Sequence, residues 1–288
     1  MKTKLIIDSS TIVSRDKLPS FVEVLPLVVI VNEEGNEKAL LDIDEINIDQ
    51  IREEIDGSKI FKTSQPNIAS MYELIEKDYD KYDRIIIHTI SSGISSTIDT
   101  MKMVIKEVDK DSKVFLLDAK LVSYGGWRLN LELFELIKKD VSTEDILKHV
   151  ENFTKKHGTF FFLTNIDFLV KGGRLSSFKG FIAKKIKLII SIFWRYDTLK
   201  PLEKDKSIVT LFKKSINTEL KFHNKKVEDI KEVVYNYDTK DHEKFKSFIE
   251  EIKKENDKIN FVWDEYKLPC AIYVHVGSGG IFFDVFFK

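Results

Sequence analysis

Hydroxyl side chains are concentrated in residues 91–97, which read Ser-Ser-Gly-Ile-Ser-Ser-Thr. A β-branched apolar run precedes them and an amphipathic segment follows, a pattern that predicts a buried strand, a tight turn and a helix start. Hydroxyls beside the partly positive N–H groups of a helix start could bind a carboxylate or phosphate without a Lys or Arg. Ser92, Ser95, Ser96 and Thr97 are the candidate residues of this turn. The alternative is that Ser95 or Ser96 only caps the helix.

Thr63 and Ser64 lie at a second predicted helix entrance. Residues 61–67 read as a polar turn that leads into a helix over residues 68–78. Pro66 favours this assignment, because a proline at a helix start lacks an N–H that would have no partner there. Thr63 and Ser64 are therefore hydroxyls at a helix entrance, like those of residues 91–97.

Arg174 follows two glycines, Gly172 and Gly173. Glycines permit unusual backbone angles and close approach to a ligand, and a guanidinium donates two parallel hydrogen bonds to a carboxylate or phosphate. Arg174 is therefore a candidate anion-binding residue. The alternative is a surface turn with a solvated arginine.

Residues 275–280, His-Val-Gly-Ser-Gly-Gly, predict a strand that ends in a glycine-rich loop. Gly277 and Gly279 would let the backbone approach a ligand, and His275 can donate or accept a hydrogen bond. The loop lacks the Lys-Ser/Thr of a P-loop and the helix of a dinucleotide fingerprint. The other histidines lack ligand spacing, so we predict no metal site.

The composition limits the class of protein. The 288 residues suffice for two domains, and 46 basic against 47 acidic residues give a net charge of −1, which does not favour nucleic-acid binding. The single Cys270 excludes an intramolecular disulfide. We find no signal-peptide pattern and no apolar run of roughly 20 residues that could cross a bilayer. We therefore expect a cytoplasmic protein without an integral membrane segment.

The first half of the chain alternates strands and helices. Strands are expected at residues 4–8, 22–31 with a break at Pro26, 85–90 and 113–117. Helices are expected at residues 68–78, 97–108, 122–138 and 142–156, with a shorter one inside 40–55. This alternation predicts a mainly parallel, doubly wound α/β domain, in which ligands bind at the carboxyl ends of the strands.

The second half has several strands joined by short turns. Strands are expected at residues 159–164, 188–194, 199–203, 233–237, 259–263, 271–275 and 281–287. Helices are expected at residues 166–170, 178–187, 207–222 and 241–257. The pattern predicts an α+β domain with a mixed or antiparallel sheet. We place the boundary near residue 157, which gives domains 1–156 and 157–288.

The chain has 21 phenylalanines, many of them in the second half. Phe160, Phe161 and Phe162 are consecutive in one expected strand, so their rings would lie on both faces of its sheet. The simplest interpretation is an ordinary core. The alternative is an elongated apolar cavity whose polar mouth is the hydroxyl-rich turn.

Five motifs occur in a characteristic order and spacing along the chain. They are Asp8-Ser9-Ser10-Thr11, Lys62-Thr63-Ser64-Gln65-Pro66, residues 90–97, Gly172-Gly173-Arg174-Leu175-Ser176 and His275-Val276-Gly277-Ser278-Gly279. Together they resemble the DegV family, bacterial fatty acid-binding proteins that serve fatty acid kinase. The resemblance runs through nearly the whole chain.

The resemblance implies two domains with one long-chain fatty acid between them and its tail buried. The family's carboxylate-binding residues then correspond to Thr63, Ser95, Arg174 and His275. The protein would be a carrier and not an enzyme. It would present the carboxylate to the catalytic subunit of an ATP-dependent fatty acid kinase, and an acyltransferase of phospholipid synthesis would use the acyl phosphate. The bound fatty acid is the only small molecule implied, with no cofactor.

Three positions depart from the family pattern. Ser96 replaces a glycine in the central turn, Leu188 replaces a proline, and Lys206 replaces an arginine. The first two bear on local backbone geometry. The third keeps the charge but loses the planar fork of the guanidinium.

Two other functions stay open. One is a serine hydrolase or acyltransferase with Ser95 as nucleophile and His275 as base, although no Gly-x-Ser-x-Gly elbow surrounds Ser95. The other is a binding protein for another apolar acid or a nucleotide-like anion. A carrier should retain acyl chains on purification, whereas a hydrolase should not.

Overall fold

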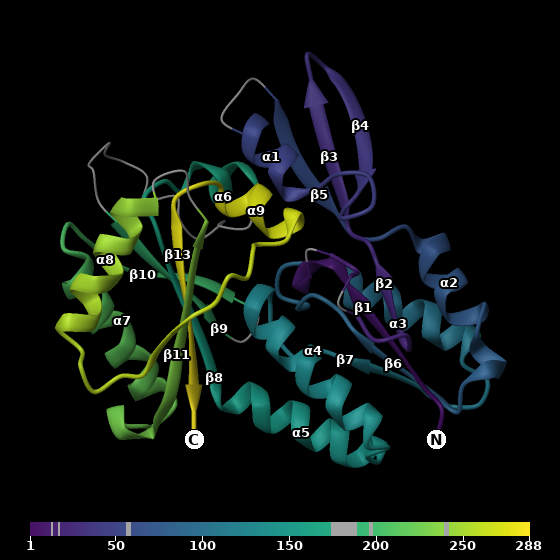
Figure 1. The fold of residues 1–288 in the computed structure, drawn as a ribbon. Coiled ribbons are helices and arrows are strands. Elements are labelled where there is room, and N and C mark those ends of the chain that lie inside the picture. The colour runs from purple at the N-terminus through teal and green to yellow at the C-terminus, as the bar shows by residue number, and fades with distance from the viewer. Residues whose placement is uncertain (13, 17, 56–58, 174–188, 196–197, 239–241) are drawn as a thin grey trace. The chain divides into compact units, whose positions relative to one another are not determined.

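The computed structural model describes residues 1–12, 14–16, 18–55, 59–173, 189–195, 198–238 and 242–288. They form two compact units (Figure 1). The first unit contains Met1–Phe153 and Leu268–Val274, and the second contains Thr154–Lys267 and His275–Lys288. The division at residue 157 stays a prediction of the sequence.

The first unit is built on a four-stranded parallel sheet of order β2-β1-β6-β7. Its strands are β1 (Thr3–Asp8), β2 (Val22–Leu25), β6 (Arg84–His88) and β7 (Val114–Leu117). The two central strands, β1 and β6, are buried at every position, as a parallel sheet covered on both faces requires. The edge strands β2 and β7 are partly exposed. The parallel α/β prediction is confirmed.

Helices complete this unit. They are α1 (Ile48–Glu54), α2 (Ile68–Glu76), α3 (Thr97–Val108), α4 (Ser123–Lys138) and α5 (Thr143–Lys155), and the short 3₁₀ segments η1 (Ser9–Thr11) and η2 (Tyr79–Lys81) add to them. The apolar stripes of α2 and α3 supply Met71, Met101 and Val104 to a core shared with the sheet. Helix α4 packs against η1, which directly follows β1.

A second, three-stranded antiparallel sheet of order β4-β3-β5 belongs to the first unit. It comprises β3 (Val28–Glu33), β4 (Asn36–Leu41) and β5 (Ile60–Ser64). The sequence predicted neither β4 nor β5, and residues 61–64 were expected to be a turn. That expectation is wrong, because β3 pairs with this segment, with Thr63 opposite Val29.

The second unit is built on a six-stranded mixed sheet of order β10-β9-β8-β13-β11-β12 (Figure 1). Its strands are β8 (His157–Leu163), β9 (Ile189–Arg195), β10 (Thr198–Asp205), β11 (Ile230–Asp238), β12 (Phe261–Trp263) and β13 (Gly280–Phe287). Only β11 and β12 among these neighbours are parallel. The predicted mixed sheet is confirmed.

Aromatic rings fill the core of this sheet. The helices α7 (Ile208–Phe222) and α8 (His242–Lys254) cover one face of the sheet. Two shorter segments, α6 (Asp167–Lys171) and η4 (Val227–Asp229), complete the helices described in this unit. Phe160 lies 5.1 Å from Phe283, centroid to centroid, and 5.7 Å from Phe212 of α7. Phe161 stacks on Phe282 on the opposite face of the sheet. Phe160 and Phe162 are therefore core residues, and the expected helix at residues 178–187 lies outside the described residues.

The expected strand at residues 271–275 is wrong: Cys270–Val276 is a helix, α9. The β-branched apolar run suggested a strand, but Pro269 precedes the helix and its carbonyl accepts from the N–H groups of Ile272 and Tyr273. The carboxylate of Asp42 also accepts from the backbone N–H of Ala271, at 3.4 Å. A carboxylate at a helix start stabilises the helix, and this tertiary contact overrides the local strand preference.

Candidate functional site

Asp8, the last residue of β1, holds the segment that follows β6. Its Oδ2 accepts from the backbone N–H of Ile90 at 2.6 Å, and its Oδ1 accepts from the N–H of Ser10 at 3.1 Å. The side chain is fully buried. Burial raises the pKa of Asp8 to about 6, although the hydrogen bonds from Ile90 and Ser10 act in the opposite direction. The carboxylate of Asp8 thus binds the segments that follow β1 and β6, and it fixes the start of the hydroxyl-rich turn.

His88 supports the same edge of the sheet from its own strand end. Its Nδ1 lies 2.6 Å from Oδ1 of Asn130 on α4, and Nδ2 of Asn130 donates to Oγ1 of Thr11 at 2.9 Å. An amide oxygen can only accept, so Nδ1 carries the proton. Burial lowers the pKa of His88, which favours the neutral imidazole. This buried chain of hydrogen bonds ties α4 to η1 and β6.

Ser95 is half-buried, and its hydrogen bonds leave it suited to a ligand. Its Oγ accepts from the backbone N–H of Thr97 at 3.3 Å and lies 2.8 Å from the hydroxyl of Thr97. Thr97 is fully buried at the first residue of α3. When Thr97 donates in this pair, the proton of Ser95 is available to an outside acceptor. Among the candidate hydroxyls of the turn, Ser95 can therefore best donate to an anion.

Ser96 is the N-cap residue of α3, but its side chain makes no capping hydrogen bond. Instead, its Oγ donates to Oε1 of Gln65 at 2.9 Å, and Oγ1 of Thr100 donates to the same oxygen at 2.9 Å. The backbone of Ser96 has φ −78° and ψ 3°, angles that any residue adopts. The serine in place of glycine therefore causes no strain here.

Gln65 brings the two predicted hydroxyl segments of the first unit together. It follows Thr63 and Ser64 directly, and its amide oxygen holds the start of α3 beside Ser95. Thr63 is half-buried and Ser64 is exposed, both at the end of β5. The predicted position of Thr63 at a helix entrance is wrong, because Asn67 caps α2 by accepting from the N–H of Ala69.

Lys120 is a residue near the turn that the sequence reasoning missed. Its Nζ donates to Oγ of Ser92 at 2.7 Å and to Oδ2 of Asp118, which also accepts from Ser92 at 2.8 Å. Burial raises the pKa of Asp118, but the bonds from Lys120 and Ser92 outweigh it and hold that pKa below its ordinary value. The hydroxyl proton of Ser92 is thus already donated to Asp118. The only sequence signal was the position of Lys120 just after a strand end.

In the second unit, His275 lies against the Gly-Gly turn. A Cβ added to Gly172 would fall 2.2 Å from Nδ1 of His275, so a larger residue there would have to displace the imidazole. Gly173 has φ +72°. Two of the predicted motifs therefore come together, although His275 lies on α9 and not at a strand end. Arg174 lies outside the described residues.

The glycine-rich loop packs against the segment after β8. Gly277 has φ +67°, and a Cβ there would fall 2.3 Å from the ring of Phe168. Oγ1 of Thr164 donates to the carbonyl of Gly279 at 3.3 Å, and Gly279 has φ +93°. Gly277 and Gly279 are therefore required by close packing and backbone angle, and their predicted contact with a ligand stays a prediction.

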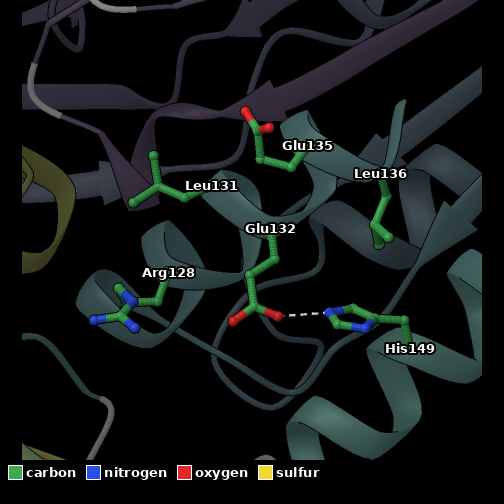
Figure 2. A pocket seen from close by; sticks show the side chains of 6 residues that line it. All are labelled: Arg128, Leu131, Glu132, Glu135, Leu136 and His149. Atoms are coloured by element: carbon green, nitrogen blue, oxygen red, sulfur yellow. Dashed lines mark hydrogen bonds and ion pairs between the residues drawn. The ribbon is translucent and has the colours of Figure 1, made fainter. Parts of the chain in front are cut away.

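A pocket of about 420 Å³ opens on the surface between α4 and α5 (Figure 2). Its lining residues are Arg128, Leu131, Glu132, Glu135, Leu136 and His149. Oε2 of Glu132 lies 2.6 Å from Nε2 of His149 (Figure 2). None of the residues predicted from the sequence lines it, so we do not assign the predicted function to this pocket.

Two further properties of the described residues bear on function. Among them, no three His, Cys, Asp or Glu side chains are placed to hold a metal ion. None of the helices in the described ranges is both long enough and apolar enough to span a membrane.

Comparison with known proteins extends these observations. A family model described as "Uncharacterised protein, DegV family" matches residues 2–285. The fatty acid-binding protein of Thermotoga maritima is 28% identical over 211 residues, which cover 71% of this chain and 71% of that protein.

Two solved structures share the fold over both full chains. One is a fatty acid-binding DegV family protein from Thermus thermophilus, with 19% identity and a TM-score of 0.79. The other is the fatty acid kinase B3 protein of Streptococcus pneumoniae loaded with linoleic acid, with 18% identity and a TM-score of 0.75. The predicted fold class is thereby confirmed. Because the family model extends over nearly all 288 residues and the fold agrees with it, the chain belongs to the DegV family.

Proposed function

We propose that this protein binds one long-chain fatty acid and presents its carboxylate to an ATP-dependent fatty acid kinase in the cytoplasm. The observation that carries the proposal is the turn at Ser95, whose hydroxyl is oriented by Thr97 and half-buried at the start of α3. Its location at the carboxyl edge of a parallel sheet is where such folds bind ligands. The relatives that are described as binding fatty acids support the choice of ligand.

The carboxylate-binding residues in this proposal are Thr63, Ser95, Arg174 and His275. The neutral donors Thr63 and Ser95 would bind the carboxylate and leave one oxygen to attack the terminal phosphorus of ATP. This step breaks the bond to the leaving ADP and yields the acyl phosphate. Arg174 and His275 would balance the charge that grows as the phosphoryl group arrives. The kinase would supply the magnesium and most of the transfer groups. In this role the protein is a substrate carrier.

The energy of binding would come mainly from the tail. Burial of a tail of about 16 carbons contributes on the order of 12 kcal/mol, at roughly 0.8 kcal/mol per methylene. The head group contributes less, because each hydrogen bond to a charged group is worth about 1.5–3 kcal/mol. We therefore expect the hydroxyls to set the position of the carboxylate more than the total affinity.

Native mass spectrometry of the purified protein, followed by solvent extraction, tests the proposal. We expect one fatty acid per chain in the extract, and its length and double bonds identify the preferred ligand. A protein that is empty and also fails to take up added palmitic or oleic acid would contradict fatty acid binding. Release of another apolar acid would support the second alternative, and turnover of a p-nitrophenyl ester that depends on Ser95 would support the hydrolase.

Ser95→Ala tests the role of the turn. We expect palmitic acid to bind about tenfold more weakly, because one hydrogen bond to a charged group is lost. The melting temperature should fall by about 2–4 °C, because the buried hydroxyl and N–H of Thr97 lose the oxygen of Ser95 as a partner. Ser70→Ala on α2 is the matched control and should leave binding unchanged. Equal affinities of wild type and Ser95→Ala would remove Ser95 from the site.

A further inference from the structure

We propose that Gln65 is an additional binding residue for the ligand's carboxylate and that its amide NH₂ selects acids over neutral lipids. The inference rests on the proposed fatty acid binding. It concerns a residue that the sequence reasoning treated only as part of a motif.

The amide of Gln65 is held in one orientation. Both Oγ of Ser96 and Oγ1 of Thr100 donate to its Oε1, each at 2.9 Å. A carbonyl oxygen has two lone pairs, so both are used. These two bonds do not use the two protons of Nε2, so the group can donate to a further acceptor. A fixed amide costs less entropy when it binds a ligand than a freely rotating one.

Gln65 lies close to the candidate hydroxyls, both along the chain and through its contact with Ser96. Thr63 and Gln65 are two residues apart, the spacing that puts side chains on the same side of an extended chain. Their exposure agrees with this, because both are half-buried whereas Lys62 and Ser64 are exposed. The side chain of Gln65 also contacts Ser96, the residue that directly follows Ser95 in the sequence.

The hydrogen-bond partners of Gln65 are uncharged, which favours binding of an anion by its amide. Its immediate partners Ser96 and Thr100 are neutral. Lys62 points to solvent, with 60% of its side chain exposed, and pairs with Glu37. Neutral donors in a half-buried site bind a carboxylate more strongly than a hydroxyl or an ester, because a hydrogen bond to a charged group is stronger. The Nε2 group therefore favours the ionised acid.

Gln65→Glu separates this role from a structural one. A glutamate keeps an oxygen that accepts from Ser96 and Thr100, but it replaces the NH₂ donor with a negative charge. We expect palmitic acid to bind about a hundredfold more weakly at pH 8, as measured by isothermal titration, because a donor becomes a like charge. Affinity for 1-hexadecanol, which has the same tail without a charge, should stay within about twofold.

Two further variants complete the experiment. Gln65→Ala removes the donor without adding charge, so we expect about a tenfold loss for palmitic acid and little change for 1-hexadecanol. Asn67→Asp adds a negative charge two residues away while an oxygen still caps α2. It should leave both affinities within about twofold, since the added charge is exposed to solvent.

The outcomes are distinguishable. Selective loss of the acid in Gln65→Glu and Gln65→Ala supports the proposal. Unchanged acid binding in both variants, or an equal loss of acid and alcohol, overturns it and leaves Gln65 a structural link between β5 and α3. If wild-type protein binds neither palmitic acid nor any extracted fatty acid, the proposed function fails instead.

Discussion

Polar loops are held by different means in the two units. In the first unit, buried carboxylates hold the backbone: Asp8 accepts from Ile90, and Asp42 accepts from Ala271. In the second unit, shape does so: Gly172 lies against His275, and Gly277 lies against Phe168. The first arrangement should respond to charge and pH, and the second to added volume. A substitution that changes charge should therefore disturb the loops of the first unit most, whereas one that adds a methyl group should disturb those of the second unit most.

The largest effect is expected in the aromatic core of the second unit. Phe160→Ala removes a fully buried ring surrounded by Phe193, Phe212 and Phe283. The free energy of unfolding should fall by about 3–5 kcal/mol, measured by urea denaturation. Phe222→Ala, at a ring that is 39% exposed, is the matched control and should cost less than about 1 kcal/mol. Similar costs for the two variants would show that packing does not dominate this unit.

The next effect sharpens the role of charge in the first unit. The pKa of Asp8 is about 6 in the folded protein, against 3.8 ordinarily. The folded state thus holds the proton more tightly, and this stabilisation is complete below about pH 4 and is lost as pH rises through 6. The difference corresponds to about 3 kcal/mol, at 1.36 kcal/mol per pKa unit.

Asp8→Asn removes this titration. Between pH 3 and 8, the wild-type protein should lose about 3 kcal/mol more unfolding free energy than the variant. Asp42→Asn is a useful comparison, because burial also raises the pKa of Asp42 to about 6 and the same window applies. Parallel stability curves for wild type and Asp8→Asn would mean that Asp8 does not titrate in this range.

The smallest of the three effects tests shape at the second loop. Gly172→Ala adds one methyl group that would fall 2.2 Å from Nδ1 of His275, so His275 must move. Overpacking of this kind costs about 1–3 kcal/mol. The amide and imidazole NMR signals of His275 should shift, whereas the backbone amide signal of Ser95 should not. An unchanged His275 spectrum with full stability would contradict the packing argument.

Local sequence patterns predicted most elements of the fold. The buried runs at β1, β6 and β7 and the amphipathic stripes of α2 and α3 are determined by neighbouring residues, and their assignment was correct. The segment of α9 failed because its helix depends on Pro269 and on Asp42, more than 200 residues away. Likewise, β5 forms through pairing with β3, which no local pattern of residues 60–64 reveals.

The candidate site shows the same limit. The hydroxyls of residues 91–97 were recognisable from composition, and the structure leaves Ser95 the most suitable donor among them. The roles of Gln65 and Lys120 were not recognisable, because each contacts the turn from about 30 residues away. Residue types thus indicated where an anion could bind, while the hydrogen bonds that orient the donors required the folded chain.

The return of Leu268–Val274 to the first unit has a consequence for synthesis of the chain. Residues 1–153 leave the ribosome first, but the segment whose Ala271 binds Asp42 follows more than 100 residues later. At 5–20 residues per second, the interval is on the order of ten seconds. During that time the carboxylate of Asp42 lacks the hydrogen bond from Ala271, so the first unit completes its structure only after residues 154–267 of the second unit have been made.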